Sequence, residues 1–139
     1  MKIRKFFSEA YNKINIIFTG IILLVFIYSG IFSSNGIKHP IKSVYAQKYY
    51  KPIVSTGLSR SFSEIIRLNF NKAREFNRNG ILVFFFFFIQ FFLRIIFSFL
   101  YSKTIFSEKT VILTDGLISA FLFFFTFRNL IFSVVNRLI

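Results

Sequence analysis

Three long apolar stretches alternate with polar segments along this chain. Residues 14–32 form the first stretch, residues 80–101 the second and residues 111–135 the third. A helix rises about 1.5 Å per residue, so roughly 20 residues cross a hydrocarbon core of about 30 Å. The pattern therefore predicts an all-α integral membrane protein, in which residues 1–139 form a single membrane domain with three transmembrane helices.

The first apolar stretch has a rival interpretation as a cleavable signal peptide. The apolar part of a signal peptide is shorter, about 7–15 residues, and it ends at a small-x-small cleavage site. The stretch at 14–32 is longer and ends in the sequence IYSGIFSSNG. We therefore expect it to remain as an uncleaved membrane span.

A polar segment over residues 33–79 separates the first two spans, and its second half has helical periodicity. Over residues 59–76, apolar positions fall near one face and charged positions on another. This pattern predicts an amphipathic helix in the membrane interface, with a solvated helix packed on protein as the alternative. Ser61 and Glu64 have capping-box spacing, which offers a second possible start at Ser61. The apolar face comprises Phe62, Ile65, Ile66, Ala73 and Phe76, and the polar face Arg60, Glu64, Arg67, Asn71 and Arg74.

The formal net charge is +13, from 18 basic and 5 acidic residues. In a soluble protein this balance would suggest nucleic-acid binding. Here the basic residues flank apolar spans, where they set topology and attract anionic head groups. We therefore expect the lipid bilayer, and no nucleic acid, as the partner of this charge. The larger number of Lys and Arg on the side of the long polar segment favours a cytoplasmic location for it, whereas the dense charge before the first span favours the opposite.

The segment before the second span carries a recognisable pattern. It contains Gly57-Leu58-Ser59-Arg60-Ser61, then Asn69-Phe70 and Ala73, and then Asn77 and Gly80. This pattern resembles the DUF2752 family of small bacterial membrane proteins, in which Gly-Leu-Thr-Arg-Ala/Ser precedes a short helix and Asn-Pro-Leu-Gly opens a span. Upstream, His39-Pro40-Ile41-Lys42 is similar to the Cys-Pro-Phe-Lys element of the family. The resemblance covers about residues 36–88 and implies a multi-pass protein of the bacterial inner membrane.

The chain departs from the family pattern at each cysteine. The family cysteines fall on His39, Ile53 and Thr56, and the chain has no cysteine at all. Disulfides, thiolate metal sites and thiol catalysis are therefore excluded. The resemblance implies an architecture and a functional surface, and it implies no reaction.

The turn and helix start near residues 56–61 form the first candidate site. Backbone N–H groups at a helix start attract anions, and an Arg there adds a bidentate grip on phosphate. We expect an anionic lipid head group or another membrane protein to bind here. The alternative is that Arg60 stabilises the turn or pairs with Glu64, while Gly57 serves the turn geometry. The candidate binding residues are Thr56, Gly57, Ser59, Arg60, Arg67 and Arg74.

Two charged residues inside the apolar stretches form the second candidate. In an antiparallel hairpin of the second and third spans, Arg94 and Asp115 lie at similar depth, and Gln90 lies one turn from Arg94. A charge at that depth costs about 2.5 kcal/mol or more, so partners are expected. The three residues form either a structural salt bridge or a polar pathway for an ion or proton. Gly116 and Ala120 have the small-x-x-x-small spacing that allows helices to approach closely.

The remaining residues indicate no catalytic chemistry. His39 has no cysteine or carboxylate nearby to complete a metal site, and the five acidic residues are scattered. We therefore expect no metal, no cofactor and no enzymatic activity. The predicted function is a non-enzymatic membrane component that binds a partner protein or anionic lipid through residues 56–78. The alternatives are a transporter or pore subunit that uses Gln90, Arg94 and Asp115, and a lipid-modifying enzyme, which no catalytic set supports.

Overall fold

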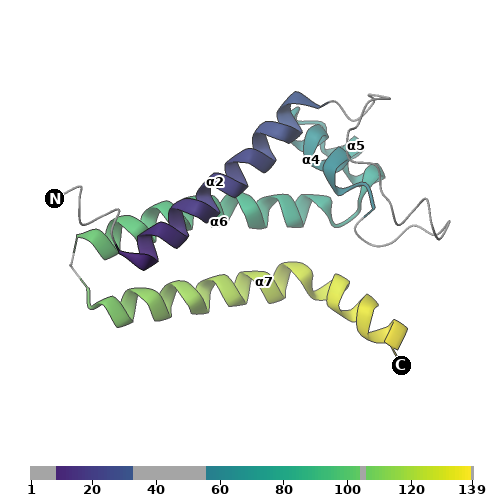
Figure 1. Cartoon of the computed structure of the whole chain (residues 1–139). Helices are drawn as coiled ribbons and strands as arrows, with labels where there is room; N and C mark the ends of the chain where they lie inside the picture. The colour runs from purple at the N-terminus through teal and green to yellow at the C-terminus, as the bar shows by residue number, and fades with distance from the viewer. Residues whose placement is uncertain (1–8, 33–55, 104–105, 139) are drawn as a thin grey trace. The chain divides into compact units, whose positions relative to one another are not determined.

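A computed structural model describes residues 9–32, 56–103 and 106–138, which form five α-helices (Figure 1). The helices are α2 (Ala10–Ile31), α4 (Leu58–Ile66), α5 (Phe70–Phe76), α6 (Gly80–Ser102) and α7 (Glu108–Leu138). The predicted all-α fold class is confirmed. The similarity at His39-Pro40-Ile41-Lys42 and the position of Ile53 lie outside the described residues.

Three of the helices are long and apolar enough to cross a membrane. These candidate spans are Ala10–Ile31, Gly80–Ser102 and Glu108–Asn136. Their ends lie within four residues of those of the spans predicted at 14–32, 80–101 and 111–135. Many of their large apolar side chains are exposed, as expected of helices that face lipid. The chain has the architecture of a multi-pass membrane protein.

The chain divides into two compact packing units. The described part of the first unit comprises residues 9–24, 86–103 and 106–125. The described part of the second unit comprises residues 25–32, 56–85 and 126–138, and it includes the whole of α4 and α5.

The amphipathic segment of the second unit consists of two helices, whereas one continuous helix was predicted over 59–76. Residues 67–69 separate α4 from α5. The N–H of Leu68 donates to the Ile65 carbonyl and the N–H of Asn69 donates to the Glu64 carbonyl, each at 2.9 Å. Leu68 has a φ of 62°, so these bonds complete a Schellman motif, which ends α4. Glycine usually occupies the left-handed position of this motif, and a leucine there carries no sequence signal for a helix end.

The start of α4 is fixed by a glycine turn that precedes both predicted starts. Gly57 has φ 83° and ψ 2°, and a Cβ on it would collide with the Phe76 carbonyl oxygen at the end of α5. The position therefore favours glycine for its dihedral angles and for its lack of a side chain. The amide of Asn77 donates to the Thr56 carbonyl at 2.8 Å and accepts from the N–H of Asn79 at 2.9 Å. These contacts join the start of α4 to the end of α5.

The helices α4 and α5 also pack closely on the start of α6 within the second unit. Phe62 and Ala73 are buried, and the Phe62 ring meets the Phe84 ring edge to face at 5.3 Å between centroids. A Cβ on Gly80 would collide with the side chain of Ser61. Glycine at the first residue of α6 therefore permits this close approach.

We expect Gly57→Ala to destabilise the second unit. An L-residue in the left-handed region costs about 1–2 kcal/mol, and the collision with the Phe76 carbonyl adds to that cost. The measurement is the thermal denaturation midpoint of the full chain in mild detergent. Gly20→Ala is the matched control, because a Cβ there meets no described atom within 4 Å and alanine favours a helix by about 0.5–1 kcal/mol. Equal midpoints for the two variants would contradict the assignment.

Candidate functional site

An ion pair between α6 and α7 lies at the centre of the first unit. Arg94 Nη1 donates to Asp115 Oδ2 at 2.9 Å, and Arg94 Nη2 pairs with Asp115 Oδ1. Asp115 is only 3% exposed, so its charge depends on protein partners. The structure thus brings together the two intramembrane charges that the sequence placed at similar depth.

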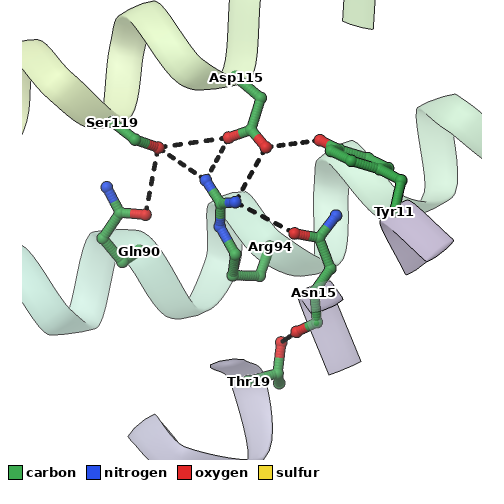
Figure 2. Close-up of polar contacts among 7 residues, drawn as sticks. All are labelled: Tyr11, Asn15, Thr19, Gln90, Arg94, Asp115 and Ser119. Atoms are coloured by element: carbon green, nitrogen blue, oxygen red, sulfur yellow. Dashed lines mark hydrogen bonds and ion pairs between the residues drawn. The ribbon is translucent and has the colours of Figure 1, made fainter. Parts of the chain in front are cut away.

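Polar side chains from all three long helices surround this ion pair (Figure 2). The hydroxyl of Tyr11 donates to Asp115 Oδ2 at 2.5 Å, and Arg94 Nη1 also donates to Asn15 Oδ1 at 3.1 Å. Arg94 Nη2 donates to Ser119 Oγ at 2.6 Å. Each carboxylate oxygen and each terminal guanidinium nitrogen of the pair is therefore hydrogen-bonded, which compensates the two buried charges.

Sequence reasoning missed Tyr11, Asn15 and Ser119, although a simple spacing identifies them. Each long helix contributes two polar residues one turn apart: Tyr11 with Asn15, Gln90 with Arg94, and Asp115 with Ser119. Residues at i and i+4 share one face of a helix. Three such pairs on apolar helices indicate three faces that meet, because polar groups in lipid need partners. We name these six residues the polar cluster.

A second set of hydrogen bonds joins α2 and α6 one turn further along. Ser98 Oγ donates to Asn12 Oδ1 at 2.7 Å, and Asn12 Nδ2 donates to Ser102 Oγ at 3.0 Å. Asn12 and Asn15 are almost completely buried. The burial of Asn12 agrees with the start of α2 at Ala10, before the predicted start at residue 14, because Asn12 lies on a helical face that contacts protein.

The helix-approach role predicted for Gly116 is wrong. A Cβ on Gly116 meets no described atom within 4 Å, and Ala120 is exposed. The small-residue spacing in α7 therefore reflects no close contact with another described helix. In the first unit, polar side chains connect the helices instead.

The structure does not gather the candidate anion-binding residues into one site. Ser59 and Arg60 are exposed near the start of α4, and the Arg60 guanidinium lies 5.8 Å from the centroid of the Phe76 ring. Gly57 and Thr56 serve the turn, the latter through its carbonyl. Arg74 is exposed on α5, and Arg67 lies at the opposite end of α4 from Arg60.

Arg67 binds the end of α2 within the second unit. Its Nη2 donates to the Gly30 carbonyl at 3.0 Å, and its Nη1 donates to the Ser63 carbonyl at 2.7 Å and approaches the Ser29 carbonyl at 3.4 Å. Ser63 Oγ donates to the Phe32 carbonyl at 2.5 Å. The last carbonyls of a helix lack intrahelical partners, and a cation stabilises that end. The last turn of α2 has no basic residue of its own, so Arg67 supplies this charge.

The residues that carry the family resemblance have local structural roles. Gly57 and Gly80 permit close approaches, Ala73 is fully buried, and Asn77 connects the turns on either side of it. No family model, curated protein or solved structure matches the chain. The resemblance therefore stays a prediction. Among the described residues, no group of three or more histidines or carboxylates could hold a metal ion.

We predict that Arg94 and Asp115 each depend on the other to compensate a buried charge. Removing one member by Arg94→Met or Asp115→Leu leaves the other charge buried and is expected to destabilise the chain by about 3–5 kcal/mol. The double variant, with two apolar residues, is expected to recover much of that loss. Thermal denaturation of all four proteins in the same detergent measures the coupling. Additive effects of the two single changes would contradict the pairing.

We also predict that Arg67 and Arg74 differ in their effect on stability. Arg67→Gln removes the charged hydrogen bonds to the end of α2, and we expect a loss of about 1.5–3 kcal/mol. Arg74→Gln removes the same charge from an exposed position of α5, and we expect a change within about 0.5 kcal/mol. Thermal denaturation and hydrogen exchange in residues 25–32 measure the difference. Equal losses of stability in the two variants would show that the positive charge, and not the hydrogen bonds of Arg67, determines the effect.

Proposed function

We propose that the chain is a non-enzymatic protein of the bacterial inner membrane whose α4–α5 surface binds anionic lipid head groups. The observation that carries this proposal is the conformation of Leu68. It combines a φ of 62° with an exposed fraction of 76%. A leucine in the left-handed conformation costs about 1–2 kcal/mol. Because the Leu68 side chain is mostly exposed, its contacts with the protein offset little of that cost. Burial of its side chain among lipid acyl chains would offset that cost.

Two further apolar side chains are exposed beside Leu68. Ile66 is 37% and Phe70 is 40% exposed. We name these three residues the apolar tip. Interfacial helices insert such side chains about 5–10 Å into the boundary between head groups and acyl chains. The apolar tip therefore supports an interfacial location for the α4–α5 surface, in the same bilayer that the long helices cross.

The charge of the same two helices supports an anionic lipid as the ligand. Glu64 is buried and accepts a hydrogen bond from Asn69 at 2.9 Å, which leaves Glu75 as the exposed acid of α4 and α5. Each Lys or Arg near an anionic leaflet contributes about 1 kcal/mol of attraction. Anionic lipids are typical of the cytoplasmic leaflet, which agrees with a cytoplasmic long polar segment. The exposed basic residues are Arg60, Lys72, Arg74 and Arg78, with Arg67 at the end of α4.

The alternative function, a transporter or pore subunit, has less support. A conducted ion or proton would have to displace the hydrogen bonds that Arg94 and Asp115 make with Tyr11, Asn15 and Ser119. We therefore assign the ion pair a structural role. A partner protein on the α4–α5 surface remains an outcome of the experiment below.

The absence of cysteine from the chain allows a site-specific test. Leu68→Cys introduces a single thiol, which is labelled with an environment-sensitive fluorophore after reconstitution into vesicles. We expect lipids with a quencher on the acyl chain to quench this label, and we expect more quenching when phosphatidylglycerol replaces part of the phosphatidylcholine. Combined substitution of Arg60, Lys72 and Arg74 by Gln should remove that dependence, because about 1 kcal/mol of attraction is lost per cation.

A label at Glu75→Cys on α5 is the matched control and should remain accessible to an aqueous quencher. Leu68→Gly separates stability from function, because it should raise the denaturation midpoint in detergent while weakening contact with anionic vesicles. A label at residue 68 that is accessible to water in both vesicle types contradicts the lipid proposal. Protection that appears only after a purified protein is added would assign the surface to a protein partner.

A further inference from the structure

A cavity of about 390 Å³ lies beside the polar cluster, within the first unit. Its walls are mostly apolar and include Phe18 and Ile22 of α2, Phe87 of α6 and Phe123 of α7. The polar residues on its wall are Gln90, Arg94 and Ser119. This volume and this lining, with a few polar groups in an apolar wall, are typical of small-molecule sites.

Gln90 lies in the wall of this cavity, and its side chain carries an unused hydrogen-bond donor. The residue is 7% exposed, and its Nε2 has no partner among the described residues. Its Oε1 accepts a weak bond from Ser119 Oγ at 3.4 Å, which orients the amide. Figure 2 shows the amide oxygen on the side of the ion pair and the amide nitrogen on the side away from it. The Nε of Arg94 is likewise buried without a described partner.

Buried polar groups are hydrogen-bonded in nearly all native proteins, so an unpaired donor calls for an acceptor. Leaving one such donor unpaired costs about 1–3 kcal/mol. One water molecule would satisfy the amide, yet it would leave most of an apolar space of this size without contacts. An apolar molecule with one acceptor group satisfies the donor and fills the cavity.

The charges of the polar cluster select against an anion as that molecule. Arg94 is neutralised by Asp115, so an added carboxylate would bury a charge without a counterion. A neutral acceptor needs only the hydrogen bond. A carbonyl oxygen fits both the donor at Gln90 and the absence of excess positive charge.

We propose that the cavity between Phe87, Gln90 and Phe123 binds a neutral lipophilic molecule whose carbonyl oxygen accepts a hydrogen bond from Gln90 Nε2. Quinones and glycerol esters are membrane-soluble molecules that carry such a carbonyl on an apolar body. This site is separate from the α4–α5 surface and does not rest on the lipid function proposed for it.

The test uses the full chain in mild detergent with four probes: a decyl-substituted benzoquinone, dioctanoylglycerol, dodecane and decanoate. Thermal stabilisation at increasing probe concentration gives each apparent Kd. We expect the quinone or the diacylglycerol to bind more tightly than dodecane and decanoate, and the tighter of the two identifies the source of the carbonyl. Gln90→Leu should weaken that binding about fivefold to tenfold, as the loss of one hydrogen bond predicts.

Two isoleucines of α2 provide a matched pair if Gln90→Leu disturbs the fold. Ile21 lines this cavity, whereas Ile16 lines a second cavity of about 340 Å³ beside Asn15 and Ser98. Ile21→Phe should fill the first cavity and weaken carbonyl binding, while Ile16→Phe, with the same added volume, should leave it unchanged. Dodecane that binds as tightly as the carbonyl probes would show acyl packing only and overturn the proposal. Preferential binding of decanoate, equal effects of the two Phe substitutions, or no stabilisation by any probe would also overturn it.

Discussion

A charged side chain in an apolar environment needs polar partners, and this need determines how the helices of the first unit pack. Arg94 lies within a helix long and apolar enough to span a membrane, and its partners come from α2 and α7. Apolar side chains provide little drive for helices to associate in lipid, because lipid contacts are nearly equivalent to them. The polar cluster therefore orients the three helices in the first unit, and phenylalanines are prominent among the apolar side chains around it.

The second unit meets the same requirement at the backbone. Arg67 binds the Gly30 carbonyl in the last turn of α2, and Ser63 binds the Phe32 carbonyl just after that helix. The helix α4 ends in a Schellman motif around Leu68. Gly57 and Gly80 allow the connecting turns to lie close together. The two units thus differ in the groups that need partners: charged side chains in the first, and the free carbonyls of helix ends in the second.

The features that follow from regular periodicity were predictable from the sequence. Long, mostly apolar runs indicated the three long helices, and similar offsets from the connecting loop indicated the pairing of Arg94 with Asp115. The break between α4 and α5 was not predictable, because left-handed leucines are rare and carry no composition signal. The role of Arg67 was also missed, because its partners are backbone carbonyls of a helix more than thirty positions earlier.

The contact between Arg94 and Asn15 has a consequence for the order of biogenesis. Because α2 and α6 precede Asp115 in the chain, the guanidinium enters the bilayer without its carboxylate where the spans insert one at a time. A lone arginine at the centre of a helix costs about 2.5–3.5 kcal/mol on insertion. The amide oxygen of Asn15, on the helix synthesised first, offers Arg94 an acceptor during that interval. Asn15 of α2 would then stabilise Arg94 in the second span until the third span is inserted, so that α2 assists the assembly of the helices that follow it.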